Sequence, residues 1–156
     1  MEDLLRDNII KLKLENKNQA VYVANIDVEN IDVLLDNIAK ELYSGADIII
    51  FDANLMSVDR MCIEVANKIK LLCGEFDASF FIKGRADIAY IVRSDGILLD
   101  NTDVYPEYAH EISGHNSILG FVGEPDVNND LIDFIIDDKV LFCVKNKIKI
   151  PVKELK

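Results

Sequence analysis

Two polar clusters stand directly after apolar runs in the middle of the chain. Lys83 follows the run 79–82, and Asp100 and Asp103 follow the run 96–99. An amine and two carboxylates could bind an anion, hold a divalent cation, or neutralise one another as an ion pair. Ligands of α/β folds bind at the carboxyl ends of the strands, so we expect both clusters at the functional end of the molecule. For Lys83 we favour an internal ion pair, with Asp52 or Asp100.

The other candidate residues also follow predicted strands. The candidate substrate-binding residues are Asp52, Asn54, Lys83, Asp100 and Asn101. Lys83 and Glu124 are the candidate catalytic residues, and Asp103 is the candidate ligand of a magnesium ion.

For Asp100, Asp103 and Glu124 we favour a structural role over a functional one. Asp100 and Asp103 could hold a divalent cation together with Asp52, but we favour Asp103 as a cap of the helix near Pro106. Asp100 would then be a solvated loop residue. Glu124 could act as a general base if apolar neighbours raised its pKa, and we favour a loop acid.

The segments around these residues alternate between strand and helix patterns. Apolar runs predict strands at 20–26, 47–51, 79–82, 96–99, 118–122 and 140–144. Helical spacing predicts helices at 31–43, 57–73, 86–92, 106–112 and 127–137. An amphipathic helix is predicted at 3–15, and a last strand at 148–152 would form a hairpin with 140–144, with Pro151 favouring a sheet edge.

This alternation predicts an α/β protein with parallel strands. A chain of 156 residues is short for an eight-fold barrel of about 250 residues. We therefore expect one domain: a truncated, incomplete TIM-like β/α barrel with an N-terminal helix (1–18), β/α repeats (20–138) and a basic C-terminal strand or hairpin (139–156). The alternative is an open doubly wound parallel sheet. The exposed strand edges could be covered by the hairpin, by helix 3–15 or by a second copy.

The composition limits the classes of partner. The formal net charge is -11 and the pI about 4.5, which argues against nucleic-acid binding. Segment 139–156 has six lysines and one acid, a charge of +5. It either packs on the acidic body or docks an acidic partner or a second copy, and we favour the first. We expect no membrane span, a cytoplasmic location, and reduced, buried thiols at Cys62, Cys73 and Cys143.

Segment 81–89, FIKGRADIA, is followed by segment 94–103, SDGILLDNTD. With these segments, residues 20–123 resemble the thiamine phosphate synthase and thiazole tautomerase family of β/α barrels. The family's third and fourth units carry Ile-Ile-Asn-Asp-Arg, Val-Asp-Ile-Ala and Ala-Asp-Gly-Val-His-Leu-Gly-Gln-x-Asp at these positions. Segment 42–47, LYSGAD, and segment 118–120, ILG, add further matches in the same order.

The differences from the family fall on its chemical positions. The resemblance implies a strand-two arginine and lysine that hold a diphosphate, and Asp52 and Asn54 stand there instead. Of the two aspartates that the family uses for magnesium, one corresponds to Gly84 and the other is kept as Asp103. The strand-five serine is Val122, and the tautomerase histidine corresponds to about Glu124.

We therefore expect a divergent relative, a pseudoenzyme without synthase activity, that serves as a binding or regulatory scaffold. It would act alone, as a homodimer or with another protein. The alternative is a thiamine-pathway enzyme, or a binder of a thiazole or pyrimidine phosphate, with altered chemistry. Magnesium is the only cofactor that the resemblance implies.

Overall fold

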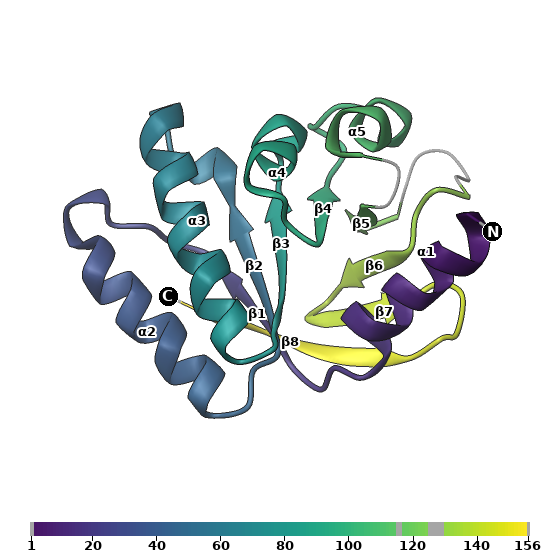
Figure 1. The fold of residues 1–156 in the computed structure, drawn as a ribbon, viewed down its shortest axis with the longest axis horizontal. Helices are drawn as coiled ribbons and strands as arrows, with labels where there is room; N and C mark the ends of the chain where they lie inside the picture. Colours follow the sequence, from purple (N-terminus) through teal and green to yellow (C-terminus); the bar gives the residue numbers. More distant parts are fainter. Residues whose placement is uncertain (1, 115–116, 125–129, 156) are drawn as a thin grey trace.

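The computed structural model describes residues 2–114, 117–124 and 130–155, and its core is a closed barrel of eight strands in chain order (Figure 1). The strands are β1 (Ala20–Val23), β2 (Ile48–Asp52), β3 (Ser79–Lys83), β4 (Gly96–Leu99), β5 (Ile118–Val122), β6 (Phe134–Asp137), β7 (Val140–Cys143) and β8 (Lys149–Leu155). The α-helices are α1 (Glu2–Ile10), α2 (Ile31–Tyr43), α3 (Asp59–Glu75), α4 (Ala86–Val92) and α5 (Pro106–Ser113). The predicted TIM-like α/β fold, with an N-terminal helix and a C-terminal hairpin, is confirmed, but the barrel is closed rather than incomplete.

The hairpin closes the barrel. Strands β1 to β6 are parallel, β7 is antiparallel to both of its neighbours, and β8 is parallel to β1. Of the expected ways to cover the strand edges, the hairpin is the one that pairs with both open strands. A hairpin needs only a short turn where a parallel crossover needs a dozen or more residues, and this lets a short chain complete eight strands.

Two predictions about this C-terminal part are wrong. The helix expected at 127–137 partly lies outside the described residues, and residues 134–137 form strand β6. Its run of phenylalanine and isoleucine suits a strand as well as a helix, and pairing with β5 and β7 decides the outcome. Pro151 does not lie at an edge, because β8 pairs with β7 and β1. The backbone N–H of Val152 donates to the carbonyl of Lys139 on the β7 side. Because neighbouring residues of a strand direct their backbone nitrogens to opposite sides, the nitrogen of Pro151 faces β1. The pairing with β1 begins only at Val152, so the missing N–H of Pro151 is tolerated.

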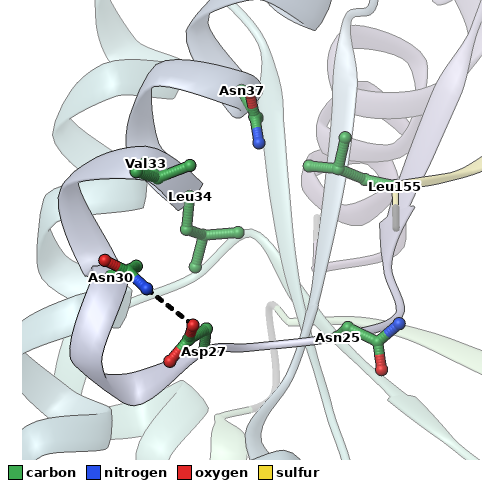
Figure 2. Close-up of a pocket in the computed structure, with 7 residues that line it drawn as sticks. All are labelled: Asn25, Asp27, Asn30, Val33, Leu34, Asn37 and Leu155. Atoms are coloured by element: carbon green, nitrogen blue, oxygen red, sulfur yellow. Dashed lines mark hydrogen bonds between the residues drawn. The ribbon is translucent and has the colours of Figure 1, made fainter.

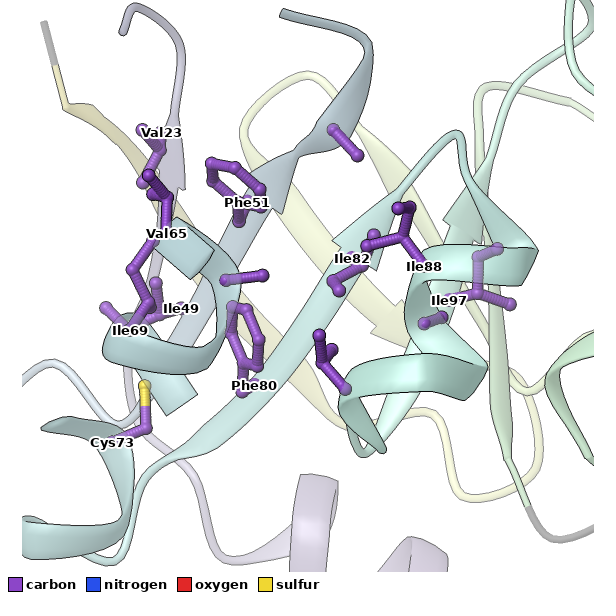
Figure 3. Packing of buried hydrophobic residues seen from close by; sticks show 14 of the residues in the cluster. Val23, Ile49, Phe51, Val65, Ile69, Cys73, Phe80, Ile82, Ile88 and Ile97 are labelled. Atoms are coloured by element: carbon purple, nitrogen blue, oxygen red, sulfur yellow. The ribbon is translucent and has the colours of Figure 1, made fainter. Parts of the chain in front are cut away.

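The outer hydrophobic layer joins helices to strands. Figure 3 shows Val65 and Ile69 of α3 beside Ile49 and Phe80, and all four belong to one buried cluster. These side chains recur at helical spacing on α3 and alternate with inward-facing residues on the strands. Helices α2 to α5 thus cover the outside of the first five strands (Figure 1).

The inner layer fills the barrel, and the N-terminal segment closes its amino-terminal end. Ile10 of α1 and Leu14 of the following π-helical turn η1 (Lys11–Glu15) are buried with the inward residues of the strands. The Ser79 hydroxyl donates to the carbonyl of Lys13 at 2.7 Å, and Lys145 in the β7–β8 turn pairs with Asp7. The carboxyl ends of the parallel strands therefore remain the open end of the barrel.

All three cysteines are free thiols and are buried, as predicted. Within the described residues, no helix has the length and apolar character that a membrane span requires.

Candidate functional site

Lys83 lies at the centre of the polar cluster at the open end. It is the last residue of β3 and only 8% exposed. Its Nζ lies 2.8 Å from a carboxylate oxygen of Asp100 and 3.7 Å from one of Asp103. The predicted ion pair of Lys83 is therefore present, and Asp100 is the partner.

The protonation states follow from these contacts. Burial alone would lower the pKa of Lys83, but the hydrogen bond to Asp100 and the charges of Asp52 and Asp103 raise it above its ordinary value. Partial burial would raise the pKa of Asp100, but Lys83 and the donors of Thr102 hold it well below its usual range. Lys83 is thus a fixed cation and Asp100 a fixed anion at neutral pH, and neither is suited to exchange a proton there.

Asp103 supports the turn after β4. Its carboxylate accepts the backbone N–H of Asp100 at 2.9 Å, and its side chain is 6% exposed. Helix α5 instead has Tyr105 at its N-cap position without a side-chain cap, so the expected capping role of Asp103 is wrong. Asp100 is not a simple solvated residue either, because it accepts from the N–H and the hydroxyl of Thr102 as well as from Lys83.

The residues present do not fit a magnesium ion. Asp103 faces an ammonium group and a backbone donor, and Gly84, at the second family position, has no side chain. Across the described part of the chain, no group of three histidine, cysteine, aspartate or glutamate side chains could hold a metal ion. The cation of this cluster is Lys83.

A second pair lies on the neighbouring strands. The hydroxyl of Tyr22 on β1 donates to Asp52 at 2.8 Å, and the other oxygen of Asp52 accepts the N–H of Asn54. Burial, followed by the hydrogen bond to Asp52, raises the pKa of Tyr22 well above its ordinary value. Tyr22 therefore remains a neutral donor. Asp52 is paired with Lys83 in the β2–β3 register, so the two pairs form one continuous cluster.

Asn54 occupies the space beside Gly84. Gly84 has a φ of +89°, and a Cβ built there would lie 1.9 Å from Nδ2 of Asn54. A side chain at position 84 would thus require Asn54 to move and would strain the backbone. Two differences from the family, at positions 54 and 84, are therefore sterically linked.

The remaining predicted residues lie outside this cluster. Asn101 is exposed in the turn after β4, and Glu124 is exposed on the loop after β5. No hydrogen bond or ion pair among the described residues joins Glu124 to Lys83. Arg85 contacts Asp87 and Asp59 and so links the starts of α4 and α3.

Sequence reasoning missed Tyr22 and Glu154. Tyr22 is the one polar side chain in β1, two residues after the inward-facing Ala20, so strand alternation could have identified it. Glu154 is register partner of Tyr22 on β8, and its charge also raises the pKa of Tyr22. The open end thus holds Asp52, Asp100, Asp103 and Glu154 with one lysine.

A groove of about 360 Å³ lies beside this cluster rather than over it. Figure 2 shows its lining residues, Asn25, Asp27, Asn30, Val33, Leu34, Asn37 and Leu155. It lies between α2 and the end of β8 and includes none of the predicted site residues.

The fold and the cluster define a small β/α-barrel protein whose polar groups converge at the carboxyl ends of β1 to β4. Comparison with known proteins identifies the family. The model of the thiamine monophosphate synthase family matches residues 21–123, and the chain belongs to this family.

Individual relatives agree. A thiamine-phosphate synthase of Clostridium perfringens strain 13 is 31% identical over 87 residues, which are 56% of this chain and 42% of that protein. A thiamine-phosphate synthase of Methanococcus maripaludis strain C5 is 36% identical over 86 residues, 55% of this chain and 41% of that protein. The structure of a thiamine phosphate pyrophosphorylase from Pyrococcus furiosus superposes with a TM-score of 0.59 at 26% identity, covering 71% of this chain and 52% of that one. The matched part of this chain spans less than half the length of these curated relatives.

Proposed function

We propose that this protein is a thiamine phosphate synthase-like barrel without synthase activity, and that it serves as a binding or regulatory scaffold. The observation that supports this most is the pairing of Lys83. The one lysine buried at the strand ends contacts two carboxylates, so its charge is already neutralised within the protein.

The charge balance works against a diphosphate ligand. Asp52 and Asn54 stand where the family resemblance implies cations, and Asp52 is only 9% exposed. A unit charge on a phosphate about 4 Å from that carboxylate would be repelled by about 4 kcal/mol at the effective dielectric constant of a protein surface. Releasing Lys83 to bind the phosphate would leave Asp100 without its cation.

A turnover assay tests this proposal. The purified protein is incubated with the pyrimidine diphosphate, the thiazole phosphate and magnesium, and thiamine phosphate is measured by chromatography. The Clostridium perfringens synthase serves as the positive control. We expect no product above the protein-free background; enzymatic product formation would refute the proposal.

One observation favours a second function, a thiamine-pathway binder or enzyme with altered chemistry. Lys83, Asp100 and Asp103 converge at the strand ends, as such a site would require. If the site binds a thiazole or pyrimidine phosphate, saturating ligand at 100 times its Kd should stabilise the fold by about 2.7 kcal/mol. Thermal denaturation with each phosphate, repeated with Lys83→Met, distinguishes the two functions: a rise in Tm that the variant loses supports the second.

A further inference from the structure

Helices α4 and α5 present an unusually apolar outer surface. Six large side chains there are between 44% and 69% exposed: Tyr90, Ile91, Val104, Tyr105, Tyr108 and Ile112. The two helices pack against each other (Figure 1), and the ring centroids of Tyr105 and Tyr108 lie 6.3 Å apart. At roughly 200 Å² for a tyrosine, the three tyrosines alone expose on the order of 400 Å². An apolar patch of this size and tyrosine content is typical of an interaction site.

The surroundings of this helix face are acidic. Segment 86–113 holds six acidic residues. Four of them, Asp87, Asp95, Asp100 and Asp103, form ion pairs with Arg85, Lys13 or Lys83. Glu107 and Glu111 are exposed on α5 beside the tyrosines. A partner for this surface should therefore combine an apolar centre with a basic rim.

The outer face of β7 and β8 has that chemistry. After β5 the described chain contains strands but no further helix. The N-terminal segment packs through Ile10 and Leu14 with the inward-facing residues of β7 and β8, not with their outer face. Leu141 and Ile150 face the interior of the barrel, so their neighbours along each strand face outward. In the β7–β8 register, outward Phe142 lies opposite Lys149, and outward Val140 lies opposite the exposed Pro151. Val144 at the end of β7 is 42% exposed.

The rim of this sheet face is basic. Lys139, Lys147, Lys149 and Lys153 are exposed in or beside the hairpin, and segment 139–156 carries +5. One of these lysines, Lys153, also pairs with Glu41 of α2. The hairpin is therefore a basic surface on a protein that is otherwise strongly acidic.

We propose that α4 and α5 of one copy of this chain dock on the outer face of β7 and β8 of a second copy. Two helices of a neighbour then cover the strands that lack helices, and Glu107 and Glu111 of the helix face meet the exposed lysines of the hairpin. A contact between two helix faces or between two sheet faces would instead bring two acidic or two basic surfaces together. With its charged rim, the helix face approaches the roughly 800 Å² per partner of a stable interface. The assembly is head to tail, and it is independent of the proposed loss of catalysis.

Two variants with exposed substitutions test this contact. Tyr108→Ser with Ile112→Ser alters the helix face, and Lys149→Glu with Val144→Ser alters the sheet face. Tyr43→Ser is the matched control, because Tyr43 is 86% exposed at the end of α2 and belongs to neither face. Circular dichroism and thermal denaturation verify that each variant folds.

Sedimentation velocity gives the readout. We expect the wild type and Tyr43→Ser to associate as concentration rises, less so at high salt, and each double variant alone to be monomeric. An equimolar mixture of the two double variants should form a 1:1 dimer and nothing larger, since one intact helix face then meets one intact sheet face. Three results would overturn the proposal: a monomeric wild type, a sheet-face variant that still self-associates, or a mixture that forms no dimer.

Discussion

Lys83→Met removes the cation of the strand-end cluster and keeps a side chain of similar length. Asp100 and Asp103 then lose their ammonium partner, and Asp103 is almost fully buried. Breaking a buried pair by removing one partner costs about 3–5 kcal/mol. Because the Asp100 side chain is 30% exposed, solvent screening reduces the expected loss to about 2–3 kcal/mol. For a chain of this size the Tm should fall by about 4–12 °C.

The loss should depend on pH. The folded state lowers the pKa of Asp100, so its contribution is present above the unfolded pKa of about 3.9 and disappears as the pH falls through the folded value. The folded state raises the pKa of Lys83, so its contribution is present below about 10.4 and disappears as the pH rises through the folded value. The cost of Lys83→Met should therefore be largest between about pH 5 and 10 and shrink at both ends.

Urea denaturation followed by circular dichroism measures this difference, at about pH 7 and at acidic pH values down to about 3. The control is Lys68→Met, which changes an exposed lysine of α3 and should cost less than about 0.5 kcal/mol. If Lys83→Met costs no more than Lys68→Met at neutral pH, the ion pair does not stabilise the barrel. If its cost is unchanged in acid, the loss comes from packing rather than from charge.

Two further predictions concern the barrel core. Gly120→Ala places a Cβ 2.1 Å from the ring of the fully buried Phe134 and should destabilise the protein by about 1–3 kcal/mol in urea denaturation. The control, Gly74→Ala in helix α3, places a Cβ that meets nothing within 4 Å and should be neutral or stabilise the protein by up to about 1 kcal/mol. Equal effects of the two substitutions would contradict the packing argument. Burial raises the pKa of Cys73 to about 12 and of Cys143 to about 11, so a thiol-specific disulfide reagent should label them in urea but not in the native protein. Labelling of either thiol in the native protein at neutral pH would show that it is accessible. The free energy of unfolding should also fall as the pH rises above about 8.5, because the thiols ionise at lower pH in the unfolded state than in the folded state.

The sequence predicts the fold best where local signals agree with the barrel. Helix α4 (Ala86–Val92) and strand β4 (Gly96–Leu99) lie where the pattern placed them, because periodicity and the neighbouring strands favour the same structure there. Strand β6 was missed because segment 131–136 is apolar without a clear period. Segment 134–137 forms a strand because it pairs with β5 in parallel and with β7 in antiparallel orientation. The local sequence pattern does not predict these pairings.

The candidate site was predictable in part. Strand-end position placed Lys83 near Asp100, and opposite charges made the ion pair foreseeable. The packing of Asn54 against Gly84 was not foreseeable, because it depends on how a loop of one strand approaches the next at a distance of a few ångströms. The contact of Tyr22 with Asp52 likewise depends on the tilt and stagger of the closed barrel, which sequence alone does not specify.

The closing hairpin connects the proposed absence of synthase activity with the proposed assembly. The β6–β7 turn contains Asp138 and Lys139 in the left-handed conformation of a tight turn. It reverses the chain where a longer β/α loop could have reached over the strand ends, and β7 carries its own carboxyl end to the opposite side of the barrel. Fewer loops are thus available at the open end to surround a phosphate. The same reversal leaves the outer face of β7 and β8 without helices. The hairpin therefore accounts both for the smaller number of loops at the open end and for the sheet face on which we propose that the helices of a second copy dock.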